Sequence, residues 1–294
     1  MPSNSNAAKP AVGFIGIGVM GKSIVRNLMK AGYSLHVSSR TKSKAEDILQ
    51  EGACWHDQPA EVAKHADVVM TMLGYPHDVE DVYYGEQGLL KHAAPDSVFV
   101  DLTTSSPELA VRLEQSARER DCFSLDAPVS GGDIGAREAK LSIMVGGSEE
   151  VFQRIRPIFE AIGTNIVYQG PAGAGQHTKM CNQIAIAANM LGVCEALRYA
   201  EKAGLDPDTV LKSIGSGAAG SWSLNNLAPR MIAGDFEPGF YVKHFIKDMG
   251  IALESAEAMG LEAHGLSLAK SLYERLAQAG EADSGTQALY KLYK

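Results

Sequence analysis

Residues 11–21, Ala-Val-Gly-Phe-Ile-Gly-Ile-Gly-Val-Met-Gly, decide the fold of this chain. Their apolar start predicts a short buried strand, and a helix is expected over residues 19–30. The glycines between them form a G-x-G-x-x-G pattern in the strand-to-helix context of a dinucleotide-binding loop. Gly16 would allow the tight turn, Gly18 the approach of a pyrophosphate, and Gly21 close packing of the helix on the sheet. The stretch predicts nucleotide binding, although three glycines also suit a plain turn.

The end of the second predicted strand, residues 34–38, indicates which nucleotide is bound. An NAD enzyme would carry an acid there to hold the ribose 2′-hydroxyl. This chain has Ser38-Ser39-Arg40-Thr41 instead. A guanidinium with the hydroxyls of Ser39 and Thr41 can hold a 2′-phosphate, and the sequence shows no carboxylate to repel it. We therefore predict NADP as the cofactor, with NAD possible. The alternative is an exposed arginine at the start of the next helix.

Strands and helices keep alternating as far as residue 170, which predicts a doubly wound, mostly parallel sheet of the Rossmann type. Ligands of such sheets bind at the carboxyl ends of the strands. The further strands are expected at 67–73, 97–102, 122–127, 140–145 and 164–168, and the further helices at 77–84, 107–119 and from 148 onward. The segments around Leu73, around Thr104 and after residue 127 are therefore candidate ligand-binding loops.

A glycine-rich loop, residues 126–136, follows one of these strands. Its backbone N–H groups at Ser130, Gly131 and Gly132 can converge on an anion, with the serine hydroxyl beside them. Such a loop would hold a substrate carboxylate. Glycine-rich loops are more often simple turns, so the loop alone does not decide between the two interpretations.

A long helix is predicted from Gln176 and carries the candidate catalytic group. Its apolar residues recur at helical spacing, so one side belongs to a core. Lys179, Asn182 and Gln183 are spaced i, i+3 and i+4 and share another face near its start. A lysine and an amide placed at the joint of two domains suit proton transfer. The alternative is a solvated first turn of the helix.

Beyond this helix the pattern contains no strands, so the second half is predicted to be all-helical. We expect a disordered tail over residues 1–10, an NADP-binding Rossmann domain over 11–170, and a helical substrate and oligomerisation domain over 171–294. Lys247 lies near the start of a helix with apolar neighbours, so it either faces a cleft or forms a surface ion pair with Asp248.

The bulk composition excludes several classes of protein. A net charge of −8 gives no basic patch for nucleic acid or an anionic membrane. The four cysteines show neither C-x-x-C spacing nor a metal pattern with the histidines, so we expect no metal and reduced core thiols. The polar N-terminus lacks the apolar region of a secretory signal, and no uninterrupted apolar run is long enough to cross a bilayer. We expect a cytoplasmic protein.

Four motifs in the same order resemble the β-hydroxyacid dehydrogenase family, which includes 3-hydroxyisobutyrate dehydrogenase and tartronate semialdehyde reductase. The resemblance runs from about Val12 to the C-terminus. The motifs are Gly13-Phe-Ile-Gly-Ile-Gly-Val-Met-Gly, Asp126-Ala-Pro-Val-Ser-Gly-Gly, Gly173-Ala-Gly-Gln-His-Thr-Lys-Met-Cys-Asn-Gln and Lys247-Asp248-Met249. Two departures are Leu73-Gly74 in place of the usual Leu-Pro, and Asn182-Gln183 in place of the usual Asn-Asn.

The resemblance implies a role for each motif. It implies that Lys179 is the general acid/base and that the substrate is held by Ser130, Gly131, Gly132 and Asn182. It implies further that the cofactor contacts Gly16, Gly18, Val19, Met20, Gly21, Met72, Leu73, Thr104 and Lys247. Arg40 resembles the NADP-preferring members, which carry Asn-Arg-Thr.

The sequence thus predicts an NADP(H)-dependent oxidoreductase of short semialdehydes, 2- or 3-oxo acids, or their hydroxy acids. A lysine desolvated in a closing cleft would have a lowered pKa suited to proton transfer. Alternatives are a phosphogluconate-type dehydrogenase, an imine reductase, which typically replaces the lysine, and a non-catalytic NADP sensor. We expect a homodimer or homotetramer, a small carboxylate-bearing substrate, and neither nucleic acid nor a membrane as partner. The physiological substrate and direction stay open.

Overall fold

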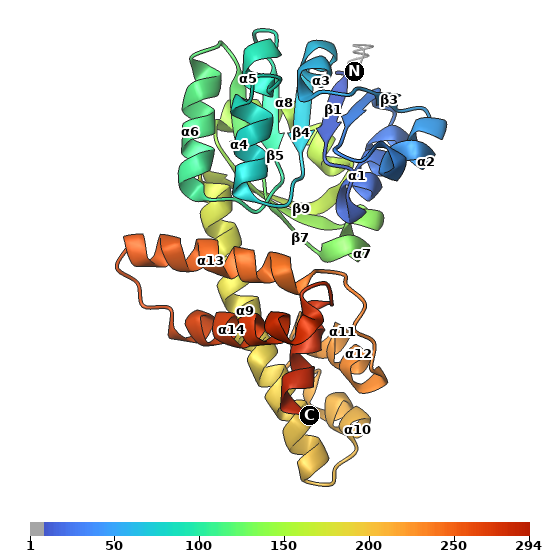
Figure 1. Ribbon diagram of the computed structural model, residues 1–294, viewed down its shortest axis with the longest axis vertical. Helices are drawn as coiled ribbons and strands as arrows, with labels where there is room; N and C mark the ends of the chain where they lie inside the picture. The colour runs from blue at the N-terminus through green and yellow to red at the C-terminus, as the bar shows by residue number, and fades with distance from the viewer. Residues whose placement is uncertain (1–8) are drawn as a thin grey trace, which may run out of the picture. The chain divides into compact units, whose positions relative to one another are not determined.

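The computed structural model describes residues 9–294 (Figure 1). These residues form two compact units, of which the first ends at Lys179 and the second is Met180–Lys294. The predicted disordered tail, residues 1–10, lies outside the described residues except for Lys9 and Pro10, so it stays a prediction.

The first unit is built on one nine-stranded sheet with the strand order β3-β2-β1-β4-β5-β6-β8-β7, and β9 pairs with β8. Neighbouring strands are parallel except where β8 runs antiparallel to β6 and β7. The strands are β1 (Val12–Ile15), β2 (Leu35–Ser38), β3 (Cys54–Trp55), β4 (Val68–Thr71), β5 (Val98–Asp101), β6 (Phe123–Asp126), β7 (Val129–Ser130), β8 (Leu141–Gly146) and β9 (Gly163–Gly170). The prediction of a mostly parallel, Rossmann-type sheet is confirmed.

Helices cover both faces of this sheet, because successive strand residues point to opposite sides and both sides are apolar. In β1, Phe14 joins the core beneath α1 and α8, whereas Ile15 joins the core beneath α3, α4 and α6. The helices are α1 (Val19–Lys30), η1 (Lys42–Ala45), α2 (Glu46–Gln50), α3 (Pro59–His65), α4 (Pro76–Tyr84), α5 (Leu89–His92), α6 (Pro107–Arg118), α7 (Gly132–Arg137) and α8 (Glu149–Glu160).

Local capping signals explain where several helices begin. The Oγ of Ser106 accepts a hydrogen bond from Leu109 N at the start of α6, with proline at the first helical position, as the sequence predicts. The Oγ of Ser148 caps α8 in the same way through Val151 N. These caps fix the return of the chain after β5 and β8.

The regular elements of the second unit are all helices, as predicted, apart from one isolated β-bridge between Tyr241 and Gly285. Asp206 caps α10 by accepting from Thr209 N. The helices are the continuation of α9 (Ala174–Lys202), then α10 (Pro207–Ile214), α11 (Trp222–Asn226), α12 (Ala228–Ala233), α13 (Val242–Ala258), α14 (His264–Leu276), the π-helical turn η2 (Ala277–Glu281) and the 3₁₀ helix η3 (Thr286–Tyr293). Met180, Ala187, Leu191 and Cys194 of α9 lie in the core of this unit, which confirms the predicted apolar side of that helix.

Helix α9 is, by length and composition alone, long and apolar enough to cross a membrane. This differs from the expectation that no apolar segment of the chain is long enough to cross a bilayer. In the most apolar window of the helix 44% of the residues are buried inside the protein. Its apolar side packs on α13 and α14 side chains such as Phe245 and Tyr273. A core helix passes the same test of length and composition, so the packing explains the apolar sequence without a membrane.

The cysteines follow the prediction only in part. All four are free thiols, and Cys122 and Cys194 are buried. Cys54 and Cys181, however, are exposed, so the prediction of core thiols is wrong for these two. Cys54 lies on the short edge strand β3, and Cys181 lies on a side of α9 that the helices of its own unit leave uncovered.

Candidate active site

The glycine-rich turn between β1 and α1 has the geometry of a phosphate-binding loop. Gly16 has a φ of 105°, and a Cβ there would lie 2.1 Å from the carbonyl oxygen of Met72. A Cβ on Gly21 would lie 2.0 Å from the carbonyl oxygen of Gly16. At Gly18, by contrast, a Cβ would meet no atom of residues 9–294 within 4 Å. The space beside the N-terminus of α1 is therefore open where a dinucleotide pyrophosphate would approach, so these residues fit the cofactor that the sequence predicts.

The ends of neighbouring strands lie beside this turn. Met72 N donates to the carbonyl oxygen of Ile15 at 2.9 Å, and Leu73 N donates to Thr103 Oγ1 at 2.9 Å. The structure thus brings Met72 and Leu73 to Gly16, and it places Thr104 in the adjacent loop after β5. These three residues are at the carboxyl ends of β4 and β5, the edge at which parallel sheets bind ligands.

A buried carboxyl group that the sequence did not single out holds these loops together. Asp101 Oδ1 accepts from Thr71 Oγ1 at 2.8 Å and from Thr103 N at 3.0 Å. Burial raises the pKa of the Asp101 carboxyl to about 6, although these hydrogen bonds act in the opposite direction. The sequence feature that could have pointed to Asp101 is an acidic residue at the end of an apolar strand. Asp101 positions the loop of Thr104 rather than facing solvent.

Gln176 and Asp126 fix the start of α9. Gln176 is fully buried, donates through Nε2 to the carbonyl oxygen of Thr103 at 2.7 Å, and accepts from Ser105 N at 3.0 Å. Asp126 accepts from Gly173 N and from Gln176 N, each at 2.8 Å. Burial raises the pKa of the Asp126 carboxyl, against the effect of these backbone hydrogen bonds. The first turn of α9 is therefore tied to the ends of both β5 and β6.

Lys179 follows one turn later on α9. Its side chain is only 7% exposed, so it is not the solvated lysine of the alternative interpretation. Nζ donates to the carbonyl oxygen of Val129 at 2.9 Å. The next residues are Ser130, then Gly131 with a φ of 128° and Gly132 with a φ of 63°. The structure thus places the lysine ammonium beside the predicted anion-binding loop, at the junction of β7 and α7.

In the second unit, two polar side chains, Gln183 and Asp248, connect Asn182 with Lys247. Asn182 Nδ2 donates to Gln183 Oε1 at 2.7 Å, and Gln183 Nε2 donates to Asp248 Oδ2 at 2.6 Å. Lys247 Nζ lies 2.8 Å from Asp248 Oδ1, with side chains 12% and 3% exposed. Of the two alternatives for Lys247, the ion pair with Asp248 is present, but it is largely buried and not at the surface. A contact of Lys247 with the cofactor stays a prediction from the sequence.

Arg40 has a partner that the sequence did not suggest. Its side chain is 86% exposed, and Nη1 lies 3.1 Å from Asp78 Oδ1 at the start of α4. The expectation that no carboxylate is present near Arg40 is therefore wrong, because the fold brings in an acid from 38 positions later in the chain. Ser39 Oγ accepts from Ile17 N at 3.4 Å, so this hydroxyl faces the glycine-rich turn. Thr41 lies directly before η1.

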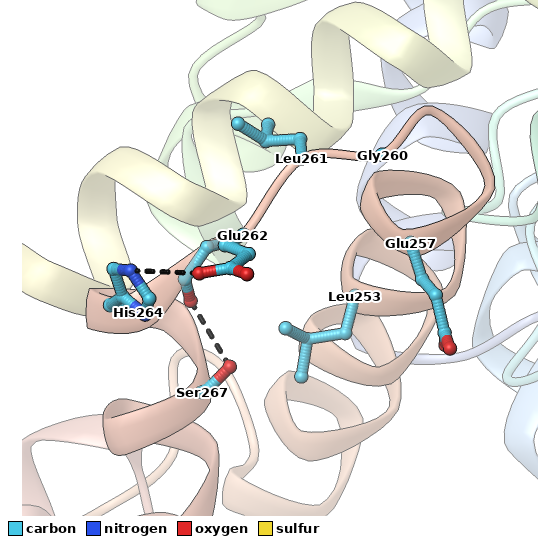
Figure 2. A pocket seen from close by; sticks show the side chains of 8 residues that line it. Leu253, Glu257, Gly260, Leu261, Glu262, His264 and Ser267 are labelled. Atoms are coloured by element: carbon cyan, nitrogen blue, oxygen red, sulfur yellow. Dashed lines mark hydrogen bonds and ion pairs between the residues drawn. The ribbon is translucent and has the colours of Figure 1, made fainter.

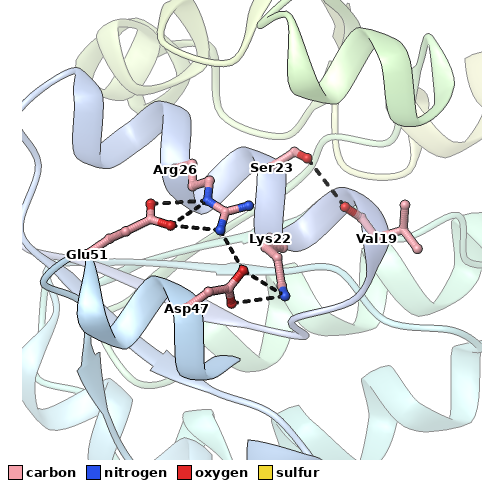
Figure 3. Close-up of polar contacts among 6 residues, drawn as sticks. All are labelled: Val19, Lys22, Ser23, Arg26, Asp47 and Glu51. Carbon is pink, nitrogen blue, oxygen red and sulfur yellow. Dashed lines mark hydrogen bonds and ion pairs between the residues drawn. The ribbon is translucent and has the colours of Figure 1, made fainter. Parts of the chain in front are cut away.

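A surface ion network holds the segment after Arg40 against α1 (Figure 3). Arg26 pairs with Asp47 at 2.5 Å and with Glu51 at 2.7 Å, and Lys22 pairs with Asp47 at 3.0 Å. The hydrogen bond from Lys22, followed by that from Arg26, lowers the pKa of the Asp47 carboxyl to about 2. The network joins α2 to α1 and so fixes the chain on both sides of the Ser39–Thr41 segment.

A separate hollow of about 490 Å³ lies in the second unit, where α13 connects to α14 (Figure 2). Leu253 and Leu261 line it together with Glu257, and His264 lies 3.3 Å from Glu262 at its edge. Its lining includes none of the residues predicted to bind substrate or cofactor.

Two family models match the chain. The NAD binding domain of 6-phosphogluconate dehydrogenase matches residues 11–170, and the NAD-binding domain of NADP-dependent 3-hydroxyisobutyrate dehydrogenase matches residues 173–293. The chain belongs to the β-hydroxyacid dehydrogenase family. The predicted resemblance is thereby confirmed over nearly the whole chain.

Individual members of the family agree with this assignment. The chain is 61% identical to the uncharacterized oxidoreductase YkwC of Bacillus subtilis, over 97% of this chain and 99% of that protein. It is 39% identical to 2-hydroxy-3-oxopropionate reductase of Escherichia coli, over 95% of each chain. The structure of Mycobacterium tuberculosis 3-hydroxyisobutyrate dehydrogenase with L-serine superposes with a TM-score of 0.89 at 31% identity, covering 98% of this chain and 100% of that one. The protein is an NAD(P)-dependent oxidoreductase of the β-hydroxyacid dehydrogenase type.

Proposed function

We propose that the protein interconverts a short semialdehyde, or a 2- or 3-oxo acid, with its hydroxy acid, using NADP(H) and Lys179 as general acid/base. The observation that carries the proposal is the buried Lys179 ammonium, 2.9 Å from the carbonyl oxygen of Val129 and next to the Ser130–Gly132 segment. Reduction of an oxo acid or a semialdehyde acid needs a proton donor for the carbonyl oxygen and a site that binds the carboxylate, and the two must lie close together.

The cofactor supplies the hydride, and the protein holds the reactants. Gly16, Gly18 and Gly21 with the N-terminus of α1 would hold the pyrophosphate, in a turn open at Gly18. Arg40, with Ser39 and Thr41, would hold the 2′-phosphate. Val19, Met20, Met72, Leu73 and Thr104 would complete the cofactor contacts.

Lys179 would move the proton. In the reducing direction Nζ donates a proton to the oxygen of the substrate carbonyl as that oxygen gains negative charge, and in the oxidising direction Nζ accepts the hydroxyl proton. The hydrogen bond to Val129 O restricts the lysine side chain to one orientation. Because Asp126 and Gln176 tie the start of α9 to two strand ends, the lysine is held on a fixed support.

The loop of Ser130, Gly131 and Gly132 would bind the substrate carboxylate. The positive φ values of both glycines turn the backbone sharply after β7. A Cβ on Gly132 would meet no atom of residues 9–294 within 4 Å, which leaves room for a ligand. Asn182, one turn after Lys179 on α9, would hydrogen-bond the reacting oxygen or the lysine.

The test is oxidation of NADPH by the purified protein in the presence of single substrates. The set contains glyoxylate, the semialdehydes of tartronate, succinate and methylmalonate, and a cyclic imine. In the reverse direction, reduction of NADP+ is followed with 3-hydroxyisobutyrate, L-serine and a phosphorylated sugar acid. The proposal is supported if the protein turns over at least one of the carboxylate-bearing substrates and if Ser130→Ala lowers kcat/KM for that substrate by raising KM. Turnover only of a cyclic imine, only of a phosphorylated sugar acid, or of no compound would favour the imine reductase, the phosphogluconate-type dehydrogenase or the sensor, respectively.

We propose separately that the protein is a homodimer or homotetramer assembled through its second unit. Large apolar side chains that its own chain leaves exposed support this proposal: Met259, Leu261 and Leu268 are 63%, 55% and 54% exposed. Leu261 lines the hollow of Figure 2, and Met259 and Leu268 are next in sequence to the lining residues Gly260 and Ser267. Light scattering at micromolar concentration is the test, and a monomer would contradict the proposal.

A further inference from the structure

The contact between Arg40 and Asp78 is an asymmetric ion pair. Arg40 is 86% exposed, and its guanidinium is held by Asp78 through Nη1 and Oδ1 at 3.1 Å. Asp78 is 13% exposed, and its Oδ2 accepts from Tyr75 N at 3.1 Å as part of the capping of α4. The carboxylate is therefore the buried partner, anchored by the cap of α4, and the guanidinium is the exposed one.

The two ends of the pair favour different cofactors. A guanidinium attracts the 2′-phosphate of NADP, whereas a carboxylate repels it and accepts a hydrogen bond from the free 2′-hydroxyl of NAD. In this chain the acid that normally follows the second strand is absent, but Asp78 brings an acid to the same arginine from α4. His77 Nε2 also lies near the pair, 3.9 Å from Asp78 Oδ1.

We propose that Asp78 is a specificity-determining residue that limits the preference of this site for NADP over NAD. The inference rests on the proposed binding of the ribose end of the cofactor at Arg40. A 2′-phosphate has to share or displace the arginine that Asp78 holds, and it does so beside a negative charge that cannot move away. A 2′-hydroxyl meets the same pair without repulsion. The site therefore accepts both cofactors, with NADP favoured less strongly than Arg40 alone would make it.

The test is Asp78→Asn, which removes the charge and keeps an oxygen for Tyr75 N. Dissociation constants of NADPH and NADH are measured by fluorescence titration without any substrate. The ratio of NADH to NADPH dissociation constants should rise by about 5- to 20-fold, and the rise should shrink at high ionic strength, since the effect is electrostatic. Asp78→Gln, which also keeps a capping oxygen, serves if the asparagine variant does not fold.

The matched control is Glu80→Gln. Glu80 lies on the same helix and pairs with Arg112, which is not a predicted cofactor residue. The substitution removes one negative charge, as Asp78→Asn does. A ratio that stays within about twofold or falls in Asp78→Asn would overturn the proposal, as would an equal rise in Glu80→Gln. Because the titration needs no turnover, it is independent of the proposed reaction. If Arg40→Gln left NADPH binding unchanged, the assignment of the 2′-phosphate to Arg40 would fail instead.

Discussion

Replacement of Asp101 by asparagine should change how the stability of the first unit depends on pH. Asp101 is 3% exposed, and burial raises its carboxyl pKa from 3.8 to about 6. A carboxyl group with a higher pKa in the folded state binds its proton more tightly when the protein is folded. Its contribution to stability is therefore fully present below about pH 4 and is lost as the pH rises through about 6.

The magnitude follows from the shift. A difference of about two pKa units corresponds to a loss of about 3 kcal/mol of unfolding free energy between acid and neutral pH. The Asp101→Asn variant would have no such loss, because the amide oxygen can still accept from Thr71 Oγ1 and Thr103 N while the side chain stays neutral. The unfolding free energy of Asp101→Asn minus that of the unmodified protein should therefore grow by about 2 to 3 kcal/mol between about pH 4 and pH 7.

Urea unfolding can follow this unit selectively. The chain has two tryptophans, so in a Trp222→Phe background the fluorescence of Trp55 reports on the unit that contains Asp101. Trp222 is 59% exposed, which makes this background change mild. Asp81→Asn, the same substitution at an exposed position, measures the effect of one lost charge. A difference between variant and parent that is constant with pH would refute the argument from burial.

Three further predictions concern other parts of the molecule. Arg40→Asp should lower kcat/KM for NADP by at least about tenfold and move the preference to NAD, and a ratio of the two kcat/KM values that Arg40→Asp leaves unchanged would contradict the role of Arg40. His36, His56 and His65 have ring centroids 4.9 to 5.5 Å apart, and burial, then the neighbouring imidazoles, lower the pKa of His36 and His56. Stability should therefore fall as the pH drops below about 6.5, and urea unfolding should show a smaller fall in His56→Gln. Gln183→Ala removes the donor to Asp248 Oδ2, one oxygen of a buried carboxylate, and should lower the unfolding free energy by about 1–3 kcal/mol in urea titrations, whereas Gln183→Asn should lose less.

The sequence predicted the features that depend on neighbours along the chain. The turn at residues 16–21, the start of α6 and the apolar side of α9 all follow from short patterns, and the structure has them within a few residues. Short or glycine-containing elements were missed. Strand β3 has two residues, too few to show alternation, and α7 contains two glycines, which locally disfavour a helix.

Contacts between distant segments could not be predicted in the same way. Asp78 reaches Arg40 across 38 positions, and Gln176 reaches Thr103 across 73. Both pairs depend on the order of the strands in the sheet. In that order β4 and β5 are neighbours, and only β1 separates β2 from β4, so the ends of these strands lie close together. A single sequence shows that Asp101 and Asp126 end apolar strands, but not that their partners are loops and a helix start. The polar support of the candidate site therefore emerged only from the fold.

Single-turnover hydride transfer in Lys179→Ala, with saturating NADPH and a substrate found in the screen, tests the central claim most directly. If Lys179 Nζ moves the proton, the rate should fall by about 10²–10⁴-fold while NADPH affinity stays nearly unchanged. Lys179→Arg should not restore the rate, since a guanidinium does not release its proton near neutral pH. A rate in Lys179→Ala within about threefold of the unmodified protein would mean that another group is the proton donor.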